Sequence, residues 1–164
     1  MRVSKENYYL NIAETVLEQS TCLRRKYGAV IVKNDEIIST GYVGAPRGRK
    51  NCTDLNFCLR EKLEVPRGER YELCRSVHAE QNAIIHAARK DMIDSTLYLV
   101  GKDVLTNSYV ENAEPCSLCK RFIINAGIKY VVIRDGENSY KKLHVSSWID
   151  NDETLNEFHG YGSK

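Results

Sequence analysis

Two stretches of the sequence, VHAEQNAII (77–85) and PCSLCKRFIINAG (115–127), decide the fold. Each follows a loop-like segment and continues with the apolar spacing of a helix, so we predict helices over 79–89 and 117–125. Gly127 marks the end of the second helix, because glycine readily adopts the left-handed conformation found at helix C-termini. The short motifs that open the two stretches are therefore expected at the starts of two helices.

The side chains in these motifs are ones that zinc prefers. His78 offers an imidazole nitrogen, and Cys116 and Cys119 offer two sulfurs at a helix start, where both can point at one ion. The positive end of the helix dipole lowers the pKa of a thiol there, which favours the thiolates that a metal needs. A catalytic zinc site uses three protein ligands and leaves a fourth position open for water. We therefore predict a catalytic zinc held by these three residues.

Glu80 stands two residues after His78, on the first turn of the predicted helix. This spacing places its carboxylate beside the metal but off the ligand position, where it can take a proton from water and deliver it to a substrate. A purely structural zinc site has no need of such a carboxylate. Glu80 is therefore the predicted catalytic acid and base.

Apolar runs outside the two motifs predict the strands of a central sheet. Ser4 is a predicted N-cap for an amphipathic helix over 5–20, and Asn34-Asp35 is a predicted hairpin turn. The predicted strands are 28–32, 36–40, 96–100 and 129–133. Strands that alternate with helices are typical of a three-layer α/β/α domain. The predicted fold class is α/β, with a mixed central sheet of about five strands.

Three segments lack a clear periodic pattern. Residues 41–77 are rich in glycine, proline and charge and are predicted to form a long loop excursion with one short helix. Residues 101–114 are predicted to form a second loop, and the polar tail over 137–164 receives no assignment. We expect residues 1–164 to form a single domain, since 164 residues can bury one sizeable core.

The composition excludes several classes of protein. A formal net charge of +2 argues against a dedicated nucleic-acid coat, which usually has a strongly basic face. The N-terminus lacks the apolar segment of a signal peptide, and no apolar run approaches the roughly 20 residues that span a bilayer. We therefore expect no membrane association and a cytoplasmic location. The six cysteines are then expected to be metal ligands or reduced thiols.

The sequence resembles the deoxycytidylate deaminase family, which has the cytidine-deaminase-like fold. His-x-Glu followed by Pro-Cys-x-x-Cys is the signature of the zinc nucleobase deaminases. The other family-like segments are STCLRR (20–25), GAVIV (28–32), GYVGAPRG (41–48), VHAEQNAI (77–84) and IINAGI (123–128). The resemblance covers residues 5 to about 135. It implies hydrolysis of a cytosine nucleotide, dCMP in the first instance, to the uracil nucleotide and ammonia.

The resemblance also implies partners and substrate contacts. Many family members are hexamers controlled by dCTP and dTTP, so a homo-oligomer with these effectors is expected. Arg24, Arg47 and Ala79 lie in family-like segments and are the candidate substrate contacts, the two arginines for a phosphate. The alternative for the arginines is that they belong to a solvated charged loop. The chain departs from the family at Val43, where the usual residue is an Asn that binds the sugar hydroxyl. It also departs at 101–114, which lengthens the approach to the second zinc motif.

Four cysteines remain outside the predicted catalytic site. They are Cys22, Cys52, Cys58 and Cys74. Four thiols are a complete tetrahedral set for a structural zinc, which some members of the family carry, and such an ion would pin the long 41–77 loop. The alternative is that these residues are reduced cysteines, some of them buried as small apolar side chains.

Two other functions stay open from the sequence. The first is a deaminase of another base or nucleotide, such as an adenine or guanine type or a tRNA adenosine deaminase, although the modest net charge speaks against tRNA. The second is a non-catalytic, zinc-stabilised nucleotide-binding module. Glu80 discriminates between the classes, because a binding module has no use for a carboxylate beside an open metal position.

Overall fold

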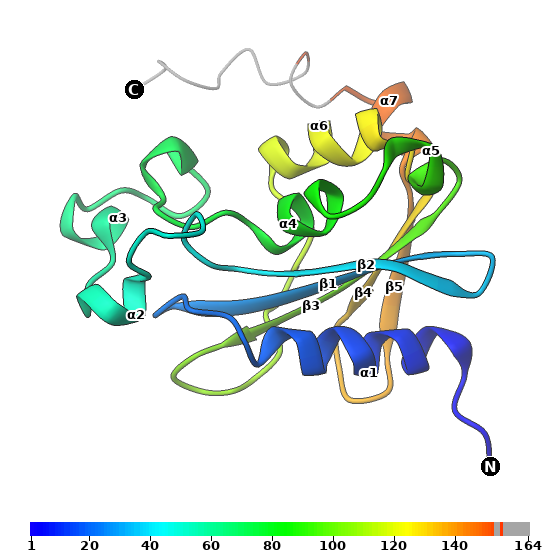
Figure 1. Cartoon of the computed structure of the whole chain (residues 1–164), viewed down its shortest axis with the longest axis horizontal. Helices are drawn as coiled ribbons and strands as arrows, with labels where there is room; N and C mark the ends of the chain where they lie inside the picture. The colour runs from blue at the N-terminus through cyan, green and yellow to red at the C-terminus, as the bar shows by residue number, and fades with distance from the viewer. Residues whose placement is uncertain (153–154, 156–164) are drawn as a thin grey trace.

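A computed structural model describes residues 1–152 and 155 and places a five-stranded sheet between layers of helices (Figure 1). The strand order is β2-β1-β3-β4-β5, in which β3 and β4 run parallel and the other neighbours run antiparallel. The strands are β1 (Arg25–Lys33), β2 (Glu36–Tyr42), β3 (Thr96–Asp103), β4 (Tyr130–Arg134) and β5 (Tyr140–His144). The predicted α/β class with a mixed sheet of five strands is confirmed.

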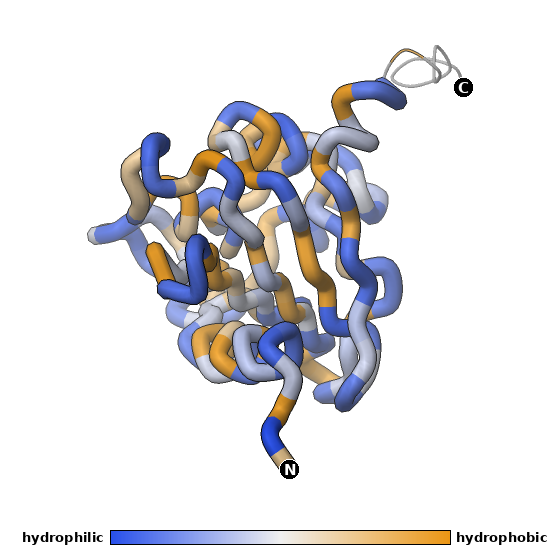
Figure 2. The backbone as a smooth tube through the Cα atoms, turned by 90° about the vertical axis from the view of Figure 1, so that its right-hand side faces the viewer, coloured by the Kyte–Doolittle hydropathy of each residue, from blue (hydrophilic) through white to orange (hydrophobic). Residues whose placement is uncertain are grey.

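One face of the sheet is covered by helix α1 (Lys5–Leu17). The side chain of Ser4 accepts a hydrogen bond from the backbone N–H of Asn7 at 3.2 Å, which confirms the predicted N-cap. The helix buries Leu10, Ala13 and other apolar side chains against the strands, as the apolar stripe in the sequence predicts. Figure 2 shows the hydrophobic segments along this helix and along the central strands.

The opposite face is covered by α4 (Ala79–Ile85), α5 (Arg89–Met92), α6 (Ser117–Ala126) and α7 (Ser146–Asp150). Gly41 of β2 allows α4 to approach closely, because a Cβ at this position would lie 2.3 Å from both the carbonyl oxygen of Ala79 and the backbone nitrogen of Ala83. Ala83 and Ile123, from α4 and α6, are fully buried over the sheet. The two helices that open with the zinc motifs therefore rest on the same face of the sheet.

The hairpin between β1 and β2 turns at Asn34 and Asp35, as predicted. Both residues have positive φ, of 50° and 65°, which is the conformation that a two-residue hairpin turn requires and that Asn and Asp tolerate. Gly127 also has positive φ, of 80°, and ends α6 where the sequence predicts.

A buried charge network joins α1 to the sheet. The carboxylate of Glu14 accepts a bond from Arg134 Nη1 at 2.7 Å and another from the hydroxyl of Tyr109 at 3.0 Å, and it pairs with Lys102. Arg134 is only 2% exposed, and its Nη2 also donates to the side-chain oxygen of Asn11 at 2.9 Å. Tyr109 belongs to the 101–114 segment, so the network anchors that segment to α1.

Several predicted boundaries differ from the structure. The helix predicted over 79–89 ends at Ile85, and α5 is separate from it. The 41–77 segment holds three short elements rather than one, α2 (Cys52–Leu55), α3 (Leu59–Lys62) and the 3₁₀ turn η1 (Tyr71–Leu73). The 101–114 segment is a loop only after residue 103, since β3 continues to that point, where it pairs with β1.

The tail predicted without assignment, 137–164, contains β5 and α7 in its first part. β5 pairs antiparallel with β4 and forms an outer edge of the sheet. Residues 153–154 and 156–164 lie outside the described residues. No helix in the described part of the chain is long and apolar enough to cross a membrane.

Candidate active site

The starts of α4 and α6 bring the two motifs together on one face of the sheet. His78 is the N-cap of α4, and its backbone N–H donates to the side-chain oxygen of Gln81 at 3.0 Å. Cys116 is the N-cap of α6, and its sulfur accepts from the backbone N–H of Cys119 at 3.4 Å. Both helices pack on each other, so residues 38 positions apart in the sequence become neighbours.

The three predicted zinc ligands form one cluster. His78 Nδ1 lies 3.3 Å from the Cys119 sulfur and 3.6 Å from the Cys116 sulfur. The three ligand atoms all lie within 4.8 Å of one another, and this is the single metal-type cluster of His, Cys, Asp and Glu found among the described residues. Zinc bonds of about 2.0–2.3 Å in a tetrahedral arrangement require ligand atoms at such separations. One nitrogen and two sulfurs therefore fit a zinc ion with one position left open.

The electrostatics of the cluster suit a metal cation. Burial works against a charged His78 imidazole, but hydrogen bonds to Cys116 and Cys74 outweigh burial and raise the pKa of His78 to about 10. A hydrogen bond from Cys119, with His78 adding to it, lowers the pKa of the Cys116 thiol well below its ordinary value. A thiolate therefore forms easily at Cys116, as a zinc site needs, while the imidazole of His78 has to give up its proton to bind the metal.

Glu80 lies on the first turn of α4 and is 5% exposed. Burial raises the pKa of its carboxyl above the ordinary value, although the charge of His78 works in the opposite direction. The carboxyl is also close enough to Cys119 to interact with its thiol. Glu80 therefore stands beside the cluster as a buried carboxyl whose pKa is raised by burial, as in many general acids and bases.

A cavity of about 150 Å³ opens beside the cluster, and we call it the site cavity. It is lined by Cys22, Arg24, Arg25, Tyr27, Val43, Cys58, Arg60, Arg67, Tyr71, Cys74, His78, Glu80, Glu114 and Cys116. Burial raises the pKa of Tyr27 to about 12, so its hydroxyl stays neutral. The ring of Tyr71 packs edge-on against His78, with 5.2 Å between the ring centroids. The cavity thus combines aromatic walls with four arginines.

The predicted substrate contacts fall in three different places. Arg24 lines the site cavity, where it pairs with Glu61 at 3.0 Å. Arg47 lies outside the lining, in a separate hollow, because its Nη2 is 2.7 Å from the Nε2 atom of His86. Ala79, the first residue of α4, is fully buried in the core. The structure therefore brings Arg24, but not Arg47, to the cluster.

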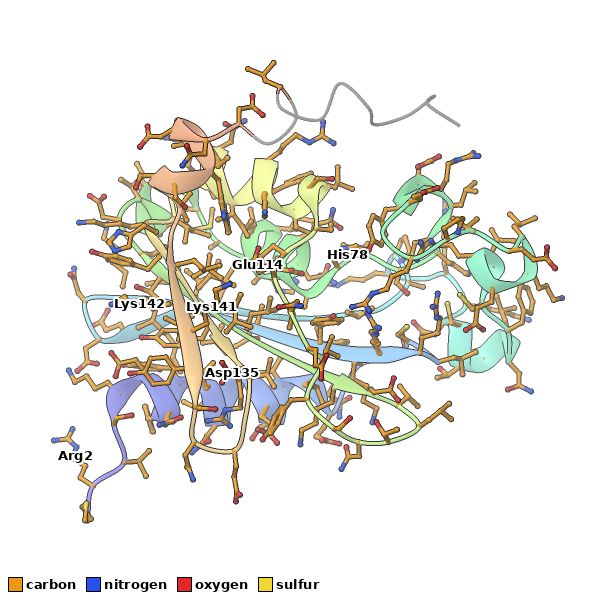
Figure 3. The ribbon with its side chains drawn as sticks, turned by 180° about the vertical axis from the view of Figure 1, so that it is seen from behind. Arg2, His78, Glu114, Asp135, Lys141 and Lys142 are labelled. Carbon is orange, nitrogen blue, oxygen red and sulfur yellow. The ribbon has the colours of Figure 1, made fainter. Side chains whose placement is uncertain are left out.

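Glu114 precedes the second motif and reaches the site cavity from the end of the 101–114 segment. Figure 3 shows it on the same side of the molecule as His78. Its carboxylate pairs with Lys141 of β5 at 2.8 Å and with Lys120 of α6 at 3.6 Å. The end of the 101–114 segment therefore borders the site cavity.

The four remaining cysteines are all free thiols, and three of them line the site cavity. Burial raises the pKa of Cys52, and the neighbouring Cys22, Cys74 and Cys58 raise it further, which brings all four into one electrostatic neighbourhood. Their sulfurs do not meet as tightly as the ligand atoms of the main cluster, since the described metal-type group within 4.8 Å consists of His78, Cys116 and Cys119.

Sequence reasoning missed several residues of the site cavity. Arg60, Arg67 and Tyr71 come from the 41–77 segment, which has no periodicity from which to predict a shared position. Arg25 is the neighbour of a predicted contact, and Tyr27 follows it on the same strand. The density of arginines in 60–70 is the signal that the sequence offers for this group.

Comparison with known proteins gives a family match. The family described as "Cytidine and deoxycytidylate deaminase zinc-binding region" matches residues 3–134. The deoxycytidylate deaminase of Mycobacterium phage D29 is 36% identical over 132 residues, which are 77% of this chain and 91% of that protein. The deoxycytidylate deaminase of Schizosaccharomyces pombe is 32% identical over 137 residues, or 84% of this chain. The chain spans only 39% of the length of that yeast protein.

A solved structure has the same fold. The crystal structure of a dCMP deaminase from the cyanophage S-TIM5 superposes with a TM-score of 0.56 and 29% sequence identity, covering 82% of this chain and 85% of the phage chain. A second structure of the phage enzyme is in complex with dCMP and dUMP, with a TM-score of 0.56 over 82% of this chain and 83% of that chain.

Proposed function

The chain belongs to the cytidine and deoxycytidylate deaminase zinc-binding family, and from this membership we propose that it hydrolyses dCMP to dUMP and ammonia. The observation that carries the proposal is the meeting of His78, Cys116 and Cys119 next to the buried carboxyl of Glu80. The names of the relatives and the aromatic, arginine-lined site cavity support a nucleotide as the substrate.

The residues present fit a catalytic zinc. His78, Cys116 and Cys119 would hold it, and the cavity leaves room for water and substrate at the fourth position. Zinc, when bound, supplies a Lewis acid that makes water a competent nucleophile near neutral pH. Two thiolates and a neutral imidazole balance its charge, which favours zinc over a harder cation.

We assign the proton transfers to Glu80. Its carboxylate accepts a proton as the oxygen of water forms a bond to C4 of the cytosine ring, and the carboxyl passes this proton to ring atom N3. The C4–N4 bond then breaks, and the second proton of the water leaves with the amine as ammonia. Burial of Glu80 supports this role because it raises the pKa of the carboxyl, which favours the protonated form that delivers a proton to the ring.

The walls of the site cavity favour a flat base. Tyr71 and Val43 present ring and aliphatic surface next to the cluster, and Val43 is 7% exposed. Val43 cannot bond the sugar hydroxyl with its side chain, so polar recognition of the sugar falls to other lining residues. Arg24 and Ala79 remain candidate substrate contacts on the strength of the family resemblance.

An ammonia-release screen tests the proposed function. Zinc-loaded protein is incubated with cytosine and adenine bases, nucleosides and nucleotides, and we expect dCMP to give the highest kcat/KM. Release of ammonia only from adenine compounds would replace the proposal with an adenine deaminase. No release from any compound by protein that contains zinc would favour a binding module.

We also propose a second, structural zinc held by Cys22, Cys52, Cys58 and Cys74. Their common electrostatic neighbourhood and the four thiols of a complete tetrahedral set support it. Metal analysis of carefully reconstituted protein is expected to give two zinc ions per chain, falling to one in Cys52→Ser. One zinc per chain in the unaltered protein would contradict this proposal.

For the whole protein we propose a cytoplasmic homo-oligomer, a hexamer by family resemblance, with dCTP and dTTP as effectors. Ile85 on α4 and Phe122 on α6 are large apolar side chains with exposed fractions of 67% and 43%, which supports burial against another copy. The six free cysteines support a reducing compartment. Light scattering with and without each triphosphate tests the assembly, and a monomer under all conditions would contradict it.

A further inference from the structure

Arg60 is a buried guanidinium on the wall of the site cavity. Its side chain is 7% exposed, and its Nη2 donates to the carbonyl oxygens of Pro66 at 3.0 Å and Glu69 at 2.7 Å. The guanidinium carbon lies 4.7 Å from the ring centroid of Tyr71, over the ring face. Arg60 is therefore held in place from one edge and one face by its own loop.

No carboxylate pairs with Arg60 among the residues that the structure describes. Its Nε is buried without an acceptor, and its Nη1 likewise has no acceptor in the described chain. Glu72 is near enough for the charge of Arg60 to lower its pKa, but it forms its ion pair with Arg70 at 2.6 Å. A buried charge without a partner is costly, so the protein gains free energy when an anion enters beside it.

The charged residues on the cavity wall differ in their pairing and in their burial. Arg24 is neutralised by Glu61, and Glu114 is paired with lysines outside the cavity. Arg25 and Arg67 also line the cavity and form no ion pair within the described residues, but both are less buried than Arg60. The wall therefore carries an excess of positive charge, with its most deeply buried cation at position 60.

The position of Arg60 relative to the cluster of His78, Cys116 and Cys119 suits a nucleotide substrate. Tyr71 contacts both sides of this arrangement, with Arg60 over its ring face and His78 packed at a near-right angle to its ring. A base that reaches the cluster would place its sugar along this wall and its phosphate at the far end. The planar guanidinium carries N–H donors that match phosphate oxygens, and its Nη1 has no acceptor among the described residues.

We propose that Arg60 binds the 5′-phosphate of the substrate and makes the site select a nucleotide over the corresponding nucleoside. The inference rests on the proposed function, which supplies the base chemistry at the other end of the cavity. It moves the main phosphate contact from the arginines expected in the family-like segments to a residue of the 41–77 loop. Arg60 acts here as a specificity-determining residue.

Comparison of two substrates tests the assignment. In Arg60→Gln we expect kcat/KM for dCMP to fall about 10- to 100-fold, which is the size of a lost hydrogen bond to a charged group, while kcat/KM for deoxycytidine changes by less than about threefold. Arg60→Lys should recover part of the loss, because it keeps the charge. Arg70→Gln, an exposed arginine of the same loop outside the cavity lining, is the matched control and should behave as the unaltered protein.

A merely structural role would give a different result. If Arg60 only holds the loop together, or only balances the charge of a thiolate cluster, Arg60→Gln should lower activity on both substrates equally, with a lower Tm or a loss of zinc in metal analysis. Equal losses on the two substrates would overturn the proposal.

Inorganic phosphate separates this proposal from the proposed function. It should raise the Tm of the unaltered protein and of Arg70→Gln but not that of Arg60→Gln, whether or not the chain deaminates dCMP. If phosphate stabilises Arg60→Gln as much as the unaltered protein, Arg60 is not the phosphate contact, even if dCMP proves to be the substrate.

Discussion

At the scale of single residues, the proton carrier Glu80 is distinct from the residues that would bind zinc. Its carboxyl is buried beside the metal cluster, and its pKa is raised by that burial. The three side chains that would hold zinc are a different set, namely His78, Cys116 and Cys119. The metal and the proton carrier can therefore be removed one at a time.

Replacement of Glu80 tests this separation. We expect Glu80→Gln to lower turnover of dCMP by about 10²- to 10⁴-fold, the usual contribution of a general acid and base, because the amide cannot carry the proton. Zinc content should stay unchanged, since the ligands are intact. The measurements are ammonia release and metal analysis. Glu111→Gln, in the exposed part of the 101–114 segment, is the control, and comparable activity in both variants would contradict the role.

Glu14 gives a residue-scale prediction about pH. Burial pushes the pKa of Glu14 upward, but bonds from Lys102, Arg134 and Tyr109 outweigh it and hold the pKa below the ordinary value. A carboxyl with a lowered folded-state pKa contributes stability that is present above its unfolded pKa and lost as the pH falls through its folded pKa. The network should therefore stabilise the fold at neutral pH and lose this contribution in acid.

Chemical unfolding measures this contribution. At about pH 7, Glu14→Gln should lower the free energy of unfolding by about 2 kcal/mol, since bonds to a charged acceptor become bonds to a neutral one. The difference from the unaltered protein should shrink below about pH 4, as Glu14 itself becomes protonated. Glu36→Gln, on an exposed position of β2, should show no such pH dependence. A difference that is constant with pH would contradict the linkage.

At the scale of elements, the position of α4 depends on one glycine. Gly41 has no side chain where α4 crosses β2, and a Cβ there would meet backbone atoms of Ala79 and Ala83 at 2.3 Å. Backbone atoms cannot move aside as a flexible side chain can. Because His78 is the N-cap of α4, a shift of this helix would also displace a predicted zinc ligand.

Gly41→Ala is therefore expected to damage both stability and the site. The free energy of unfolding should fall by at least about 1–3 kcal/mol, as overpacking in a core usually costs, and zinc affinity should fall with it. Thermal unfolding and competition with a chelator measure the two effects. Gly44→Ala is the matched control, because the nearest atom to a Cβ at that position is 3.4 Å away. An unchanged zinc affinity in Gly41→Ala would show that α4 does not depend on this contact.

Elements with strong local signals could be predicted from the sequence. Ser4 marks the start of α1, Asn34 and Asp35 mark the hairpin, and Gly127 marks the end of α6, because each has a backbone conformation or capping bond specific to its residue type. The strands followed from their apolar runs. The two zinc motifs predicted the cluster because their chemistry depends on residue type and spacing alone.

The elements without local signals could not be predicted. The 79–89 helix was predicted too long, since the composition remains helical past Ile85 where the structure interrupts it. The antiparallel pairing of β5 with β4 is a tertiary contact of a polar strand. Arg60 reaches the site cavity only because α3 and the following turn fold back together, and Arg47 is drawn away by His86. These outcomes depend on tertiary packing, which residue type does not reveal.

At the scale of the whole molecule, the metal cluster joins the starts of two helices that belong to distant parts of the sequence. An ion that binds only the folded chain stabilises it through mass action, and removal of zinc should therefore lower the Tm. The expected fall is about 2–4 °C for each kcal/mol of binding free energy lost. Thermal unfolding with and without a chelator, checked by metal analysis, measures it.

Glu80→Gln is a useful control for this experiment, because it should lose activity while keeping the chelator-dependent fall in Tm. The two readouts then distinguish the structural contribution of the cluster from its chemistry. An unchanged Tm after complete loss of the metal would mean that the helix packing alone holds the site together.

The outer edge of β5 bears on aggregation of the protein at high concentration. An unpaired strand edge exposes amide and carbonyl groups that can recruit a strand from another molecule and start aggregation. Tyr140, Lys141 and Lys142 follow one another along this strand and are all exposed. Lys142 carries an exposed ammonium group and Lys141 an ion pair with Glu114, so charged and hydrated side chains flank this edge on both faces of the sheet and disfavour pairing with an identical edge.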